Sequence, residues 1–416
     1  MGRIKKSKLL KNGLWLFVLQ VFNTVVPMVT IPYITRVLGT AGYGAFSLAQ
    51  NWILYFQVIV EYGFGFWGAR RIAVSGKECL QNTFSTIITS RLVLMGLSAA
   101  VMCIVYMLSG KEIGHYICMS ILFSMVVGAA FQLTWLFQGM QDMKYITVIN
   151  ALSRLISVLL TFLMVRKPSD VYLYCFLYSC TYLFSAVIGL WVARRKYLLK
   201  IRLCKFSDIL VGLKDAWPLF ISQAMSKVLS GFGVTILGMV AANSTVGIYS
   251  AMYKIPYAMA LLFAPISQAI YPDISVAFGE SQKVGIGRVK KIAGWIVPAF
   301  LSASVLIMMF NRPLVEIMFG NAYASSSFIL IPLVAWFVVS VINNFLGIQL
   351  LTGSGHQKEY SNAFLISGFF SVVLNIVFGK LFGMSGIACA TLVSEIIMSG
   401  LLLYQVKRVF VKGNAT

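Results

Sequence analysis

The sequence predicts an all-α membrane protein of twelve transmembrane helices in two six-helix bundles. Composition, apolar runs and an internal repeat together give this prediction. Of the 416 residues, 59% are hydrophobic and 11% are charged, and the mean hydropathy is +0.86. Soluble domains carry about 25% charged residues. The composition therefore excludes a water-soluble globule and a disordered chain, and it indicates a polytopic helical membrane protein.

Apolar runs define the predicted spans. A transmembrane helix needs about 20 predominantly apolar residues. Twelve runs meet this length, at 12–35, 43–69, 84–109, 113–140, 145–165, 170–193, 216–240, 246–273, 291–311, 327–352, 361–383 and 386–406. The longest connection between them has about 22 residues, so we expect no soluble domain between the spans.

Basic residues predict the orientation of these spans. The chain carries 34 Lys and Arg and a net charge of +22. The termini and the connections on one side of the predicted membrane contain 24 of these residues, and the connections on the other side contain 6. Cytoplasmic loops are enriched in Lys and Arg. We therefore expect both termini in the cytoplasm. The positive charge is explained by this asymmetry, so no nucleic-acid partner is expected.

An internal repeat predicts the two bundles. At an offset of 203, residues 16–20 align with 219–223 and residues 44–47 with 247–250. Because each repeat contains an even number of spans, the repeats insert the same way up, related by a pseudo-two-fold axis along the membrane normal. The predicted domains are an N-terminal six-helix bundle (1–193), a basic cytoplasmic linker (194–215) and a C-terminal six-helix bundle (216–416). Such an architecture suits alternating access.

The linker 194–215 admits two interpretations. Apolar and basic residues alternate along it, which is typical of an amphipathic helix lying on an anionic cytoplasmic leaflet. A simple loop that sets the topology explains the same charges. The sequence leaves these two alternatives open.

Charged residues inside the spans are the first candidates for function, because a charge in the membrane is costly and usually faces a cavity or a partner. Arg154, Lys227 and Glu395 lie near the middle of their spans. Arg91 and Lys254 lie nearer an end, where snorkelling to the interface is an alternative.

Polar faces on four spans extend this candidate set. Helical spacing gives the first, second, seventh and eighth spans a polar face each, and a shared water-filled cavity explains the four faces together. Positive charges outnumber negative ones inside the spans, so the cavity favours an anionic head group, for which Arg and Lys are suited. The candidate substrate-binding residues are Lys227, Lys254, Arg154, Arg91, Gln20, Asn23, Asn51, Gln57 and Gln223.

Glu61 is the preferred coupling or gating carboxylate. It shares a helical face with Gln57, and the repeat places Ala264 at the corresponding position, so the two halves differ there. A carboxylate in a cleft of low dielectric constant can pick up a proton, whereas a nearby Arg91 would favour the charged form. A structural pair between Glu61 and a basic residue is the alternative. Glu395 competes for the coupling role.

Several short stretches resemble a known family. They are Leu9–Trp15, Pro27–Gly39, Gly42–Gly44, Gly63–Gly65, Ala69–Arg71 and Trp135–Gly139. These stretches resemble bacterial polysaccharide repeat-unit flippases of the Wzx type, within the multidrug/oligosaccharidyl-lipid/polysaccharide superfamily. The resemblance is dense over 9–145 and looser beyond.

The resemblance implies a function. Its substrate would be an undecaprenyl-diphosphate-linked oligosaccharide, moved from the cytoplasmic to the outer leaflet of the bacterial inner membrane for O-antigen, capsule or exopolysaccharide assembly. Partners would be this substrate, membrane lipids, a polysaccharide polymerase and a chain-length regulator. The sequence predicts no enzyme, cofactor or metal site, since it has no Walker A, HExxH or GxSxG motif.

Three alternatives remain at this stage. A multidrug or cation antiporter would share the fold but prefer an acidic cavity, and a lipid-linked peptidoglycan precursor flippase is usually longer. A membrane polysaccharide polymerase would need catalytic carboxylates in a long external loop, and the connections here are short.

Overall fold

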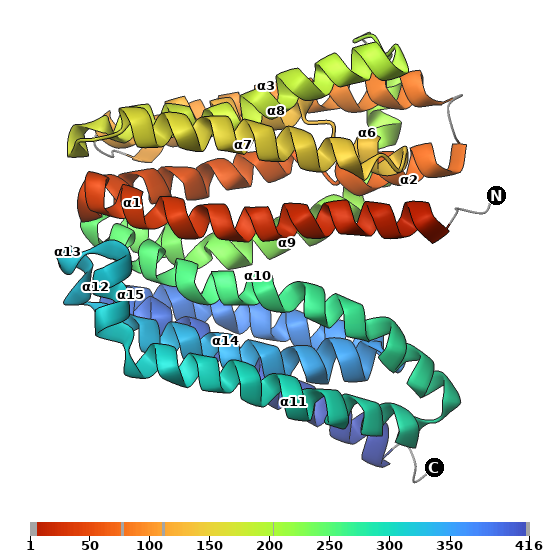
Figure 1. The fold of residues 1–416 in the computed structure, drawn as a ribbon, viewed down its shortest axis with the longest axis vertical. Helices are drawn as coiled ribbons and strands as arrows, with labels where there is room; N and C mark the ends of the chain where they lie inside the picture. Colours follow the sequence, from red (N-terminus) through yellow and green to blue (C-terminus); the bar gives the residue numbers. More distant parts are fainter. Residues whose placement is uncertain (1–5, 76–78, 110–112, 203, 413–416) are drawn as a thin grey trace. The chain divides into compact units, whose positions relative to one another are not determined.

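The computed structural model describes residues 6–75, 79–109, 113–202 and 204–412 (Figure 1). Within these ranges all regular secondary structure is helical, and no strand occurs. Ten helical stretches among the described residues are long and apolar enough to cross a membrane. The prediction of an all-helical, multi-pass membrane protein is therefore confirmed.

Helices in the first half of the chain are as follows. They are α1 (Lys6–Glu61), α2 (Phe64–Ser75), α3 (Leu80–Ser109), α4 (Ile113–Leu122), α5 (Ser124–Phe131), α6 (Thr134–Gly139), α7 (Met143–Met164), the 3₁₀ turn η1 (Pro168–Asp170) and α8 (Val171–Tyr197). The region predicted as a single span over 113–140 is thus three short helices, α4 to α6.

Helices in the second half are longer. They are α9 (Phe206–Val240), α10 (Asn243–Glu280), α11 (Gln282–Met309), α12 (Asn311–Phe319), α13 (Asn321–Ala324), the 3₁₀ turn η2 (Ser327–Ile329), α14 (Leu330–Asn344), the π-helical η3 (Phe345–Thr352), α15 (Gln357–Lys407) and the π-helical η4 (Arg408–Lys412). The π-helical η3 continues α14 without a break, so the tenth predicted span changes its helical pitch near residue 345.

Two helices contain a sharp break. α1 has 56 residues and α15 has 51, whereas about 20 residues cross the hydrocarbon core. The backbone leaves the helical conformation at Gly39 (φ 66°) in α1 and at Gly383 (φ 58°) in α15. Positive φ is accessible to glycine at little cost, so each glycine allows a reversal that another residue would resist. Both breaks lie beside boundaries that the sequence predicted between consecutive spans.

The chain divides into two compact units. The first contains Met1–Thr30 and Ala45–Gly231, and the second contains Ile31–Gly44 and Phe232–Thr416. In the first unit α8 packs against α5. It also packs against α7, which lies beside it in Figure 1, and α2 packs against α6. The Phe46 ring of α1 lies 4.6 Å from Tyr174 and 5.2 Å from Tyr178, which places this part of α1 against α8.

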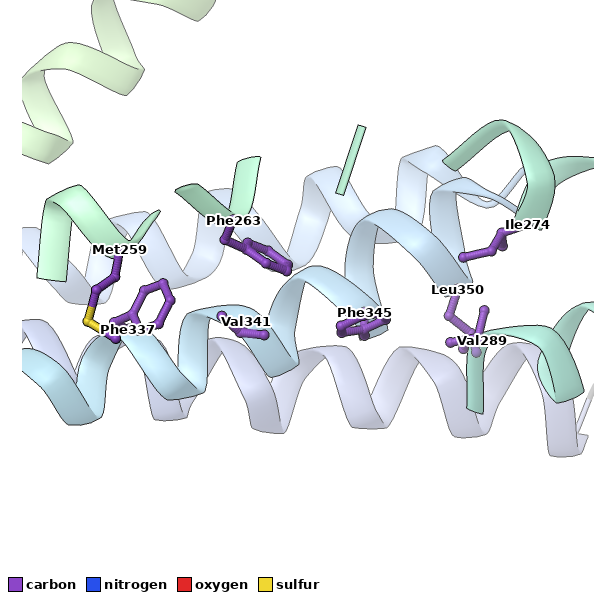
Figure 2. Packing of buried hydrophobic residues seen from close by; sticks show 8 residues of the cluster. All are labelled: Met259, Phe263, Ile274, Val289, Phe337, Val341, Phe345 and Leu350. Atoms are coloured by element: carbon purple, nitrogen blue, oxygen red, sulfur yellow. The ribbon is translucent and has the colours of Figure 1, made fainter. Parts of the chain in front are cut away.

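The second unit has an apolar core between α10, α11, α14 and η3. Figure 2 shows its buried side chains: Met259, Phe263, Ile274, Val289, Phe337, Val341, Phe345 and Leu350. Within a membrane, lipid tails are as apolar as these side chains, so close van der Waals packing holds the helices together rather than transfer out of water. This core fixes α10 against α14.

The connection between α8 and α9 interrupts the helical conformation within the predicted linker. α8 ends where Leu198 adopts the left-handed conformation (φ 56°), and residues 198–202 and 204–205 lie outside helices. The Gln81 side chain donates to the Lys200 carbonyl (2.7 Å) and accepts from the Lys200 amide (3.1 Å). A single continuous helix over 194–215 is therefore not formed, because α8 ends at Tyr197 and α9 begins at Phe206, and the placement of this linker on the cytoplasmic leaflet stays a prediction.

Candidate functional site

The predicted site residues fall into both units. Lys254 and Glu395 lie in the second unit, and the other predicted residues lie in the first. Each group is described within its own unit.

In the first unit, the second half of α1 runs antiparallel to α9. The Tyr62 and Phe220 rings stack with centroids 4.5 Å apart. About 11 residues further along α9, Gly231 lies against Asn51 and Tyr55, where a side chain at position 231 would collide with both. From the first contact to the second, the residue numbers rise along α9 and fall along α1, so the two helices are antiparallel and their register is fixed. Lys227 must therefore lie at a level of α1 between Asn51 and Tyr62.

Glu61 and Lys227 are neighbours in this arrangement. The Glu61 carboxylate interacts electrostatically with Arg91 and Lys227, although neither pair comes within the 4.0 Å of a salt bridge in the described chain. Lys227 is exposed, and its ammonium makes no hydrogen bond among the described residues. Gln223 is half-buried one turn away on the same face. The Lys227 charge thus has a loose partner and remains open to an anionic ligand.

Arg91 has a different setting. Its side chain is only 3% exposed, so it does not snorkel. Its guanidinium donates to the carbonyls of Gln132 (2.8 Å) and Ala129 (3.3 Å), where α5 ends before α6. The last carbonyls of a helix have no partner inside the helix. Arg91 therefore satisfies a helix end and places its positive charge near Glu61.

Arg154 joins two elements of the first unit. Its Nη1 donates to Asn23 Oδ1 at 2.9 Å, which links α7 to the first half of α1. Tyr182 of α8 lies close enough to Arg154 and Glu61 to interact electrostatically with both. These residues form a polar cluster inside the first unit.

Other predicted residues surround this cluster. Gln57 is buried, and its Nε2 lies 3.4 Å from the Met125 carbonyl. Asn51 is buried, and its amide donates to the Tyr55 hydroxyl at 3.3 Å. Gln20 is half-buried on α1, one turn before Asn23.

In the second unit, Glu395 lies among neutral donors. The Trp336 indole N–H donates to Oε2 at 3.2 Å, and the Asn343 amide donates to Oε1 at 2.9 Å. The Ser399 hydroxyl in turn donates to Asn343 Oδ1 at 2.7 Å. Sequence reasoning missed Trp336, Asn343 and Ser399. Their spacings carry a signal, since Trp336 and Asn343 are seven residues apart and Glu395 and Ser399 are four apart, which places each pair on one helical face.

Lys254 is half-buried on α10. The preceding Tyr253 lies with its ring centroid 5.7 Å from that of Trp336, and it also stacks on Tyr249 and Tyr257 at 6.1 Å. Lys254 therefore begins a helical segment that is tied to the Glu395 cluster through aromatic rings.

The two units offer different chemistry. The first contains Arg91 and Lys227 beside the Glu61 carboxylate and Arg154 beside Tyr182, and this excess of cations favours an anion such as a phosphate group. The second surrounds a carboxylate with N–H groups that carry no charge. In the described residues no group of three or more His, Cys, Asp or Glu is placed to hold a metal ion.

Comparison with known proteins gives two close parallels in sequence. The chain is 29% identical over 412 residues to a protein named "Putative O-antigen transporter" from Escherichia coli (strain K12), covering 98% of both chains. It is 24% identical over 404 residues to the "Probable low-salt glycan biosynthesis flippase Agl15" of Haloferax volcanii, covering 93% of this chain and 81% of that protein. Both relatives are named for transport rather than catalysis, which agrees with the prediction that this chain is no enzyme.

A solved structure shares the fold. The structure titled "Lipid II flippase MurJ, inward closed conformation" superimposes with a TM-score of 0.73 over 96% of this chain and 87% of that chain, at 13% identity. The model of the family described as "Polysaccharide biosynthesis protein" matches residues 9–278, well over half of the chain. The chain therefore belongs to the polysaccharide biosynthesis protein family.

Proposed function

We propose that the chain carries an undecaprenyl-diphosphate-linked oligosaccharide from the cytoplasmic to the outer leaflet of the bacterial inner membrane. The observation that carries this proposal is the likeness to an O-antigen transporter over 98% of both chains. The flippase fold and the cationic interior of the first unit support it. The sugar–diphosphate head would cross through protein while the lipid tail remains in the bilayer.

Twelve crossings in two six-helix bundles would serve this function. The breaks at Gly39 and Gly383 support the count, because each divides a helix that is more than twice as long as one crossing needs. An even number of crossings leaves both termini on one side, and the excess of Lys and Arg in the connections of that side makes it the cytoplasmic one. Reporter fusions at Lys205 and Lys412 should then read cytoplasmic and a fusion at Asn243 external. A cytoplasmic reading at Asn243 would contradict the twelve-span arrangement.

Residues of the first unit would bind the head group. Lys227 would meet the diphosphate or an acidic sugar, because its charge has only a loose partner. Arg154, Asn23 and Gln57 would supply further donors from the polar cluster. Glu61 would lie next to Lys227 and Arg91 in this site, and Arg91 would hold the end of α5 beside it. Membrane lipids, a polymerase and a chain-length regulator would be the partners.

The leaflet that holds the lipid-linked glycan tests the proposal. Cells with and without the protein would be compared for total lipid-linked glycan and for its accessibility to a membrane-impermeant glycan-modifying reagent. We expect cells without the protein to accumulate unpolymerised glycan that the reagent cannot reach. Glycan that is reachable in the absence of the protein but unpolymerised would instead identify a polymerase.

A further inference from the structure

The second unit contains a surface hollow that the proposed head-group site does not use. It lies between α12 and the part of α1 that belongs to this unit, Ile31–Gly44, and its volume is about 560 Å³. The groups that line this α12 hollow are charged, amide and apolar: Arg36, Pro313, Glu316, Ile317, Gly320 and Asn321. The hollow therefore offers several kinds of contact to one ligand.

The end of α12 shapes the hollow. The Arg36 guanidinium donates to the Ile317 carbonyl, which is one of the last carbonyls of α12 and has no partner inside the helix. α12 ends at Phe319, and Gly320 continues the chain with φ 96°, a conformation that glycine adopts at little cost. A Cβ at position 320 would lie 3.5 Å from Arg36 Cγ, so the glycine leaves this space to the hollow.

α12 presents two different faces. Val315 and Phe319 are 0% and 1% exposed, and their spacing of four residues places them on one inward face that anchors the helix. Glu316 and Ile317 are exposed beside the hollow. An anchored helix thus presents a carboxylate and an apolar side chain together, which suits a ligand that has both polar and apolar parts.

The two charged groups of the hollow do not form an ion pair. The two salt bridges among the described residues involve neither Arg36 nor Glu316. A guanidinium only donates hydrogen bonds, a carboxylate only accepts them, and the Asn321 amide does both. The hollow therefore combines donors and acceptors, and its two formal charges cancel.

This combination of groups fits a neutral sugar. Each sugar hydroxyl both donates and accepts, so the hydroxyls of one ring can bind Arg36, Glu316 and Asn321. Pro313 and Ile317 supply an apolar wall for the C–H groups of the ring. A phosphate group would be repelled by the carboxylate, and a cation would be repelled by the guanidinium. The hollow thus differs from the cationic site of the first unit, which favours an anion.

The proposed topology gives the hollow its side of the membrane. The twelve-span arrangement puts Asn243, the first residue of α10, outside. α10 then crosses inward and α11 crosses outward, so α12 follows the outer end of α11. In this arrangement the hollow faces the side on which the transported glycan emerges.

We propose that the α12 hollow is a second glycan-binding site, which holds a neutral sugar of the transported glycan at the outer face of the membrane. This inference rests on the proposed function and deepens it, because it adds a site for the sugars to the site for the charged head group.

Binding of a lipid-free glycan to the purified full-length protein tests the proposal. The probe is the repeat-unit oligosaccharide that mild acid releases from the lipid-linked glycan, without lipid or diphosphate. Saturation-transfer NMR should show that it binds the wild type. Glu316→Ala should bind it about 10-fold more weakly, because a hydrogen bond to a charged group is lost.

The matched control is Arg312→Ala, which removes an exposed charge of α12 that does not line the hollow. It should bind the glycan as the wild type does. Equal binding by Glu316→Ala and the wild type would overturn the proposal. Weaker binding by Arg312→Ala, or no binding by the wild type, would overturn it as well.

Inorganic diphosphate distinguishes the hollow from the cationic site of the first unit. An excess of diphosphate should leave glycan binding unchanged, since the Glu316 carboxylate repels this anion. Displacement of the glycan by diphosphate would show that the glycan binds at the cationic site and would overturn the proposal.

A photoreactive diazirine derivative of the same glycan tests the side of the membrane, because it does not cross a bilayer. Added to spheroplasts, it reaches only the outer face and should label peptides from residues 311–324, which mass spectrometry identifies. Labelling of these peptides only after permeabilisation would overturn the placement of the hollow at the outer face.

Vesicles separate this inference from the proposed function. Wild-type protein that moves an undecaprenyl-diphosphate-linked glycan but binds no lipid-free glycan would overturn the α12 site alone. Wild-type protein that binds the lipid-free glycan through Glu316 but moves no lipid-linked glycan would overturn the proposed function alone.

Discussion

Each unit places one carboxylate inside an apolar helix, and the two carboxylates have opposite surroundings. Glu61 in the first unit lies beside the positive charges of Arg91 and Lys227. Glu395 in the second is held by the neutral N–H groups of Trp336 and Asn343. Positive neighbours and N–H donors both favour the charged form of a carboxylate, whereas burial opposes it at both sites. The comparison teaches that only the first unit gathers cations around its carboxylate, so an anionic group is favoured there and not in the second unit.

The largest effect on glycan export is expected from substitution of Lys227, the residue of the first unit to which we assign substrate binding. Lys227→Ala should abolish glycan export at normal protein levels, because losing one charged contact to a diphosphate costs about 2 kcal/mol or more, about 30-fold in affinity. Lys227→Arg should retain part of the export, since the charge remains with altered geometry. Export would be measured as surface glycan per amount of protein.

A matched control is Lys283→Ala, an exposed lysine at the start of α11. It should export as the wild type does. Full export by Lys227→Ala as well would show that Lys227 is a packing or snorkelling residue.

Arg91 should affect folding more than binding. Arg91→Ala removes the guanidinium donor from the Gln132 carbonyl and leaves the Ala129 carbonyl only the Gln132 N–H, and we expect a loss of about 3 kcal/mol in the free energy of unfolding in detergent micelles. Arg288→Ala breaks an exposed ion pair with Asp273 and should cost less than about 1 kcal/mol. If Arg91→Ala left the free energy of unfolding unchanged but abolished export, Arg91 would be a substrate-binding residue rather than a structural one.

The behaviour of Arg91 illustrates what sequence can and cannot predict. Its position inside an apolar run indicated a costly charge, and the composition and length of that run are enough to predict this. Its partners, the carbonyls at 129 and 132, depend on α5 ending there, and the sequence predicted one continuous span over 113–140. Helix breaks set by tertiary packing leave no mark in hydrophobic periodicity.

The partners of Glu61 and Glu395 could not be predicted either, because they depend on contacts between residues far apart in the sequence. Glu61 and Lys227 were each chosen from a polar helical face, but their proximity depends on the antiparallel register of α1 and α9, which is a long-range contact. Glu395 was chosen as a charge, whereas Trp336 and Asn343 were missed because they lie 59 and 52 residues away. The breaks at Gly39 and Gly383 were anticipated in place, since both lie beside gaps between apolar runs.

The smallest effect is expected for the pair of Arg154 and Asn23. Asn23→Leu and Arg154→Met, singly and together, form a double-mutant cycle in the free energy of unfolding. We expect a coupling of about 1 kcal/mol, because the residues share a 2.9 Å hydrogen bond within the first unit. Additive effects within about 0.3 kcal/mol would indicate that the bond does not hold α7 to α1 and that both side chains serve the substrate alone.

The most direct measurement compares three proteins in vesicles loaded with undecaprenyl-diphosphate-linked glycan, with and without a pH gradient. The wild type should move glycan between leaflets and respond to the gradient. Lys227→Ala should move none under either condition, and Glu395→Gln should move glycan without responding to the gradient. Equal movement by Lys227→Ala and the wild type would contradict substrate binding in the first unit, and an undiminished gradient response in Glu395→Gln would contradict a coupling role for the second.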